Sequence, residues 1–223
     1  MKKINLKGDV VSDSVGKLFD WFDLDAIYPK KVRDIFDNLN DEDVEVIMTT
    51  NGGSVFAGQE IYDIVKSHKG KTTLKVSGLV ASIGTLISCA FDEVLISPVG
   101  TFMIHNPRVG EVSGEKKDME KATQLLSTIE QTLINAYSKK TGMQAEELAE
   151  LMDKETFMNA SEAVERGFVD GVIEETENNL MLVASHDSLV NSSFIEKLEK
   201  LKNEKEKENA TTRLRFLELQ EEK

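Results

Sequence analysis

The stretch GLVASIGTLISCAF, residues 78–91, decides the fold and marks the first candidate for chemistry. The preceding KTTLKVS, residues 71–77, alternates as a strand does, whereas the apolar residues after Ser82 follow helical spacing. This change of period predicts a strand-to-helix elbow at Ser82. The first backbone amides of a helix have no intrahelical acceptors and can donate to an anion. The elbow therefore places the Ser82 hydroxyl, a potential nucleophile, beside such donors. A serine that starts a helix is, however, more often only its N-cap.

A glycine pair forms the second motif, TTNGGSVFAGQEIYDIV at residues 49–65. It places Gly52 and Gly53 between a predicted strand and a predicted helix. Paired glycines accept positive φ and let another backbone approach closely. This suits a donor to an oxyanion and an extended peptide docked along the strand edge, although an isolated NGG is usually a turn.

A histidine ends the third motif, the short apolar strand TFMIHNP at residues 101–107. Imidazole with a pKa near 6.5 can take a proton from a hydroxyl and return it to a leaving amine. His105 is therefore the candidate base. A single histidine at a strand end is more often structural, so the order of the three motifs together is the specific signal.

Together these motifs resemble the Clp protease proteolytic subunit family of serine peptidases, and within it the phage branch of ClpP-like prohead or head maturation proteases. The resemblance covers residues 3–175 and rests on NGGSVFAGQEIYDIV, VSGLVASIGTLISCA, DEVLISPVGTFMIHNP and ETFMNASEAVERGFVD. It implies that Ser82 is the nucleophile and His105 the base. The amides of Gly52 or Gly53, together with that of Ile83, would then form the oxyanion hole.

The third member of the implied triad departs from the family pattern. The family has an aspartate two residues before the aromatic of ETFMNASEAVERG, and this chain has Glu155 ahead of Phe157. Glutamate can orient an imidazole as aspartate does, but its extra methylene requires a slightly retreated backbone. Asp153 is the alternative orienter, and both carboxylates could instead be solvated charges.

The alternation of strand and helix signals predicts an α/β fold with a largely parallel sheet. The resemblance sharpens this to the ClpP/crotonase fold of repeated ββα units, with a protruding handle helix and a helical C-terminal extension. The predicted strands are 3–11, 44–50, 72–77, 93–97 and 101–105, and the predicted helices are 29–39, 55–67, 82–91, 115–140, 146–152 and 161–166.

Composition divides the chain into three parts. We expect a protease domain at 1–175, a polar linker at 176–193 and a charge-rich helical or partly disordered tail at 194–223. The long helix 115–140 has an apolar stripe that needs a partner surface. The resemblance implies a handle that joins two heptameric rings; packing on its own domain is the alternative.

Charge and residue usage exclude several function classes. The net charge of −13 is the wrong sign for general nucleic-acid binding. The only cysteine, Cys89, reads as a core residue and permits no intramolecular disulfide. We expect no metal, no cofactor and no P-loop ATPase site. The longest apolar run, 76–91, is shorter than the roughly 20 residues that span a bilayer, and no apolar leader follows Met1, so we expect a cytoplasmic protein.

The resemblance therefore implies a serine endopeptidase that processes phage capsid or scaffold protein during head maturation, in the host cytoplasm or the assembling prohead. Its substrate would be polypeptide, and it would form a homo-oligomeric ring. Three alternatives stay open: a general degradative subunit that works with a separate ATPase, a catalytically silent shell or scaffold component, and a crotonase-type acyl-CoA enzyme with the same fold.

Overall fold

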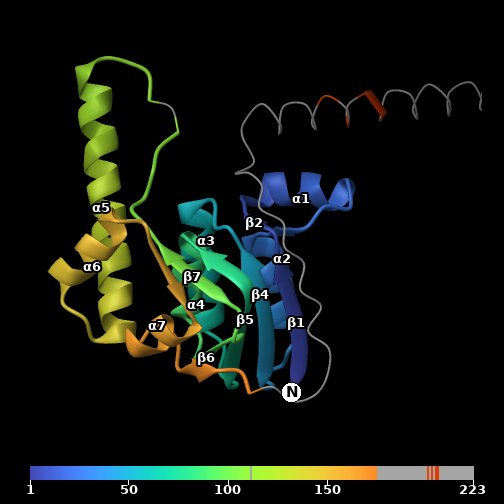
Figure 1. Cartoon of the computed structure of the whole chain (residues 1–223). Helices are drawn as coiled ribbons and strands as arrows, with labels where there is room; N and C mark the ends of the chain where they lie inside the picture. The colour runs from blue at the N-terminus through green and yellow to red at the C-terminus, as the bar shows by residue number, and fades with distance from the viewer. Residues whose placement is uncertain (111, 175–199, 201, 203, 206–223) are drawn as a thin grey trace, which may run out of the picture.

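A parallel sheet organises the computed structural model, which describes residues 1–110, 112–174, 200, 202 and 204–205 (Figure 1). Five strands lie side by side and run parallel: β1 (Lys2–Lys7), β4 (Val44–Thr50), β5 (Thr72–Ala81), β6 (Glu93–Ile96) and β9 (Gly171–Val172). A further strand, β7 (Thr101–Ile104), pairs in parallel with the end of β5 and antiparallel with β8 (Thr156–Asn159). The predicted α/β class with a largely parallel sheet is confirmed.

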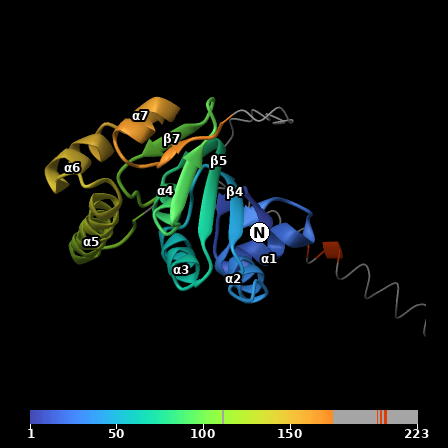
Figure 2. The ribbon, with the colours of Figure 1, turned by 90° about the horizontal axis from the view of Figure 1, so that it is seen from below.

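The main core lies between this sheet and the helices on one of its faces. Alternate residues of the central strands are fully buried, as in Val44, Val46 and Met48 of β4. Figure 2 shows α2 (Pro29–Asp37) and α3 (Val55–Lys66) together on that face, and α4 (Ile83–Ser88) follows β5 directly. Pro29 opens α2 as predicted, because its fixed φ suits the first helical position.

The long helix α5 (Lys116–Thr141) packs on the body over only part of its length. Its buried residues are Ile129, Leu133, Ile134 and Tyr137, all in the second half. The first half carries exposed Met119 and Leu125 and rises away from the other elements in Figure 1. The predicted apolar stripe is therefore covered at one end and open at the other. Helices α6 (Ala145–Asp153) and α7 (Ala160–Glu165) follow.

A small N-terminal module differs from the prediction. The predicted strand 3–11 is divided at Gly8, whose φ of 104° interrupts the extended run. The second part, β2 (Asp9–Val10), pairs with β3 (Ala26–Ile27). Between them lies α1 (Asp13–Trp21), a helix that we did not predict. Its Gly16 lowers helix propensity, yet the site has no room for a side chain, since a Cβ there would lie 2.2 Å from the Tyr28 ring.

Other boundaries also differ from the predictions. The strand β5 continues past the predicted end to Ala81, and the short strands β8 and β9 were not predicted. The predicted linker 176–193 lies outside the described residues. Of the predicted tail, the structure describes only four residues, all helical: Lys200, Lys202, Glu204 and Lys205. Within the described ranges, no helix is long and apolar enough to cross a bilayer.

Candidate active site

Ser82 stands at the turn between β5 and α4, as predicted. Its backbone has φ 55° and ψ −127°, a conformation that costs a non-glycine residue of the order of 1–3 kcal/mol. Its amide donates to the carbonyl of Met103 in β7 at 2.9 Å, which fixes the elbow to the neighbouring strand. Strain of this kind is typical of a nucleophile held at a sharp strand-to-helix turn.

A series of hydrogen bonds connects the Ser82 elbow to Thr85 and then to Tyr137 of α5. The carbonyl of Ser82 accepts from the Thr85 amide at 3.0 Å and from Thr85 Oγ1 at 2.6 Å. The Tyr137 hydroxyl of α5 lies 2.6 Å from the same Oγ1. Because burial raises the pKa of Tyr137 above its ordinary value, the phenol stays protonated at any working pH. The second half of α5 thus contacts the serine turn through two hydroxyls.

His105 follows β7 directly and faces the serine. Its Nε2 lies 2.6 Å from Ser82 Oγ, within the distance that proton transfer needs. Burial lowers the pKa of His105 below its ordinary value, the Arg108 guanidinium lowers it further, and the Glu155 carboxylate raises it. The imidazole is therefore neutral at neutral pH, as a general base must be.

The glycine loop lies against the nucleophile. A Cβ on Gly52 would lie 2.6 Å from that of Ser82, so only glycine fits there. The Gly52 amide donates to Thr50 Oγ1 at 3.0 Å and is thus already engaged. No acceptor in the described part of the chain takes the amide of Gly53 or of Ile83. Of the two predicted glycines, Gly53 therefore has the amide available for an oxyanion.

The two carboxylates predicted to orient His105, Glu155 and Asp153, lie in exposed positions. Glu155 has φ 48°, an exposed side chain and Arg108 as its partner, with Oε1 and a guanidinium nitrogen 3.7 Å apart. Asp153 Oδ1 accepts from the Asn106 side-chain amide at 2.6 Å. His105 Nδ1 is buried, and no partner for it lies among the described residues. Neither predicted orienter accepts a hydrogen bond from the imidazole in this structure.

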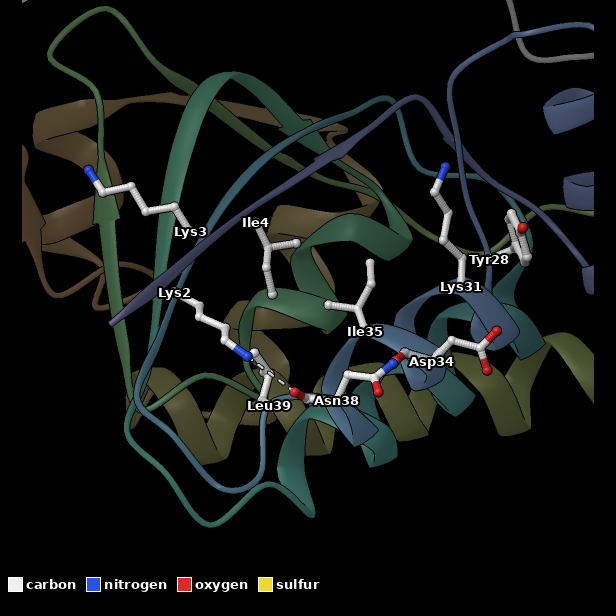
Figure 3. Close-up of a pocket in the computed structure, with 9 residues that line it drawn as sticks. All are labelled: Lys2, Lys3, Ile4, Tyr28, Lys31, Asp34, Ile35, Asn38 and Leu39. Carbon is white, nitrogen blue, oxygen red and sulfur yellow. Dashed lines mark hydrogen bonds between the residues drawn. The ribbon is translucent and has the colours of Figure 1, made fainter.

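A separate hollow lies between β1 and α2 (Figure 3). Its lining includes Lys2, Lys3, Lys31, Ile4 and Ile35 but none of the predicted catalytic residues. No cluster of three potential metal ligands occurs among the described residues. Burial raises the pKa of the Cys89 thiol to about 12, and its Sγ donates to the Thr85 carbonyl at 3.2 Å, which suits a packing role.

A strained serine at a strand-to-helix elbow, hydrogen-bonded to a histidine that directly follows a neighbouring strand, is an arrangement typical of a serine hydrolase. Comparison with known proteins narrows the class. The Clp protease family profile matches residues 35–176, and the chain belongs to that family. It is thus a serine-type peptidase that acts on polypeptides.

Individual relatives agree with this assignment. The ATP-dependent Clp protease proteolytic subunit 1 of Chlamydia trachomatis serovar D is 33% identical over 131 residues, 57% of this chain and 68% of that protein. The protein of the same name in Chlamydia abortus is 32% identical over 131 residues, with the same shares. The ATP-dependent Clp protease proteolytic subunit of Deinococcus radiodurans is 29% identical over 148 residues, 65% of this chain and 72% of that protein.

Sequence reasoning missed four residues that support the site. Thr85 stands three residues after Ser82, a spacing that predicts a bond back to the elbow carbonyl. Tyr137 lies within the predicted helix 115–140, where we interpreted the apolar residues only as a stripe that needs a partner surface. Arg108 and Val10 gave no local signal. Only the fold brings Arg108 to Glu155 and places the Val10 amide 2.8 Å from the Gly52 carbonyl, to which it donates.

Proposed function

We propose that this chain is a serine endopeptidase in which Ser82 attacks the scissile carbonyl and His105 takes its proton. The observation that carries this assignment is the 2.6 Å distance between Ser82 Oγ and His105 Nε2. The lowered pKa of His105 keeps Nε2 free to accept. The protonated imidazole then returns the proton to the leaving amine, and water hydrolyses the acyl-enzyme by the same two transfers.

The amides of Gly53 and Ile83 are the proposed oxyanion hole. Ile83 follows Ser82 in the chain, and Gly53 follows Gly52, where a Cβ would lie 2.6 Å from that of Ser82; neither amide has an acceptor among the described residues. Two such donors stabilise the charge that develops on the tetrahedral intermediate. The amide of Gly52 supports the loop through Thr50.

Glu155 is the proposed orienter of the imidazole. Its charge already raises the pKa of His105, so the carboxylate acts on the ring electrostatically. To accept from Nδ1, the side chain would exchange its exposed contact with Arg108 for the imidazole. Exposed ion pairs contribute about 0–1 kcal/mol, so this exchange costs little. Asp153 is the alternative.

For biological role we propose processing of capsid or scaffold protein in an assembling phage head. The resemblance of the glycine-pair and ETFMNASEAVERGFVD motifs to the phage branch supports it, as does the charged stretch after residue 194. The test is co-expression with the cognate capsid precursor, with and without residues 194–223. Unprocessed precursor beside the full-length enzyme would refute the role, and equal processing without the tail would refute its part in targeting.

A general degradative subunit is the second candidate, favoured by the relatives that are named ATP-dependent. Both roles use a closed ring, and the open half of α5, with Met119 and Leu125 exposed, supports assembly through that helix. Light scattering on the wild type and on Leu125→Glu tests this. A stable wild-type monomer, or an unchanged assembly in the variant, would contradict it.

A further inference from the structure

The N-terminal module contacts the loop that carries Gly53. This module consists of β2, α1 and β3, and it has a small core of its own made of Val11, Leu18, Phe19, Ala26 and Tyr28. The family match begins at residue 35, so the module lies outside it. Its contact with the loop is made by the backbone of Val10.

Two hydrogen bonds join Val10 to the residues on either side of Gly53. The Val10 amide donates to the Gly52 carbonyl at 2.8 Å, and the Ser54 amide donates to the Val10 carbonyl at 2.7 Å. Gly53 itself has φ 142°, and a Cβ there would lie 2.1 Å from the Val10 carbonyl oxygen. The backbone around Gly53 is thus fixed on its outer side, while Gly52 contacts Ser82.

The module is itself attached to the start of α2. Asp13 Oδ1 accepts from the Lys30 amide at 2.8 Å, and the Tyr28 hydroxyl donates to Asp20. Burial, and then the bond to Asp20, raise the pKa of Tyr28 to about 12, so this donor keeps its proton. Figure 3 shows Tyr28 and Lys31 together at one end of the hollow beside α2.

We propose that Val10 is a positioning residue for the oxyanion hole: its backbone fixes the peptide plane that aims the Gly53 amide at the reacting carbonyl. An oxyanion donor acts through a fixed orientation, and a displacement of about 1 Å can cost roughly 10²-fold in rate. This inference rests on the proposed function, because it needs Ser82 and Gly53 in their assigned roles.

The sharpest test compares Ser54→Pro with Ser54→Ala. Ser54 already has φ −66°, which proline adopts, so the substitution removes the amide that donates to Val10 without forcing φ. The alanine control keeps that amide and loses only the hydroxyl. We expect kcat for a peptide substrate to fall about 10- to 100-fold in Ser54→Pro, with KM changed less than about threefold. Affinity for a peptide boronate, which forms a tetrahedral adduct, should fall in parallel, and Ser54→Ala should keep both values near wild type.

Val10→Pro tests the other of the two hydrogen bonds, the one from the Val10 amide to the Gly52 carbonyl. It removes the donor to Gly52, and Val11→Pro is its control, since the Val11 amide bonds to Ile27 inside the module at 2.9 Å. We expect the loss of kcat and of boronate affinity in Val10→Pro only. Wild-type kcat in both Ser54→Pro and Val10→Pro, or equal losses in each variant and its control, would overturn the proposal. Full activity in Ser82→Ala would instead refute the proposed function on which it rests.

Discussion

The two sides of His105 differ sharply in how the chain holds them. On the Nε2 side, Ser82 is fixed by β7, by Thr85 and by the packed glycine loop, and its Oγ lies 2.6 Å from the ring. On the Nδ1 side, Glu155 is exposed, 3.7 Å from Arg108, and Nδ1 has no partner among the described residues. Core packing thus positions the proposed nucleophile and base, whereas the side chain of the proposed orienter Glu155 is held only by an exposed ion pair among the described residues.

This difference predicts which residues of the proposed site can be substituted with the smaller loss of activity. In the proposed mechanism Ser82 and His105 take part directly in every proton transfer. A carboxylate that only orients the ring contributes through the tautomer and the charge of the imidazolium. Substitutions should therefore be most harmful on the Nε2 side.

Ser82→Ala should have the largest effect. Removal of the nucleophile alone costs about 10⁶ in kcat in comparable triads. Alanine must adopt the same strained backbone conformation as Ser82, so the substitution leaves the strain of the turn unchanged. We expect peptide hydrolysis to vanish and the thermal unfolding midpoint to stay within a few degrees of wild type. Turnover near the wild-type rate would remove Ser82 from the mechanism.

Glu155→Gln should reduce kcat less, by at most about the 10⁴-fold that other triads lose when their acid becomes an amide. Asp153→Asn is the matched control, because Asp153 already accepts from Asn106 and should matter little. Steady-state kinetics of the two variants decide the assignment. A larger loss in Asp153→Asn would transfer the orienting role to that residue.

The pH profile of kcat/KM should report the opposed charges around His105. Activity requires neutral imidazole, so it falls as pH drops through the His105 pKa. Because Arg108 lowers that pKa and Glu155 raises it, Arg108→Ala should move the acidic limb to higher pH. Glu155→Gln should move it to lower pH. Shifts in the same direction for both variants would contradict this arrangement.

Tyr137→Phe should have the smallest effect of the four. It removes one buried hydrogen bond to Thr85 Oγ1, which contributes roughly 1 kcal/mol to the free energy of unfolding. The bond from Thr85 to the Ser82 carbonyl stays, so kcat should fall only a few-fold. Tyr62→Phe is a matched control on α3, where the described residues offer the hydroxyl no hydrogen-bond partner. Equal destabilisation in the two variants would contradict a stabilising hydrogen bond between the Tyr137 hydroxyl and Thr85 Oγ1.

The sequence alone predicted the class of fold, and it predicted that the motifs around Ser82, His105 and the glycine pair lie close together. Period changes along the chain predicted most of the parallel strands, and the elbow lies at Ser82 as predicted, although β5 extends to Ala81, beyond the alternating residues 71–77. Such local patterns predict elements well because they depend on nearest neighbours.

Long-range features could not be predicted in the same way. Helix α1 needs Gly16 against the Tyr28 ring, a tertiary contact that overrides propensity. The preference for Gly53 over Gly52 depends on Thr50, which takes the Gly52 amide. The ion pair between Arg108 and Glu155 joins residues 47 positions apart in the sequence, and no local pattern marks it.

Covalent labelling tests the central claim most directly. The protein is treated with a serine-directed fluorophosphonate, and the modified peptide is identified by mass spectrometry in the wild type, Ser82→Ala and His105→Ala. The 2.6 Å contact between Oγ and Nε2 predicts a single adduct on Ser82 in the wild type, none in Ser82→Ala and a much slower reaction in His105→Ala. An adduct on another serine, or peptide hydrolysis that persists without any adduct at Ser82, would contradict it.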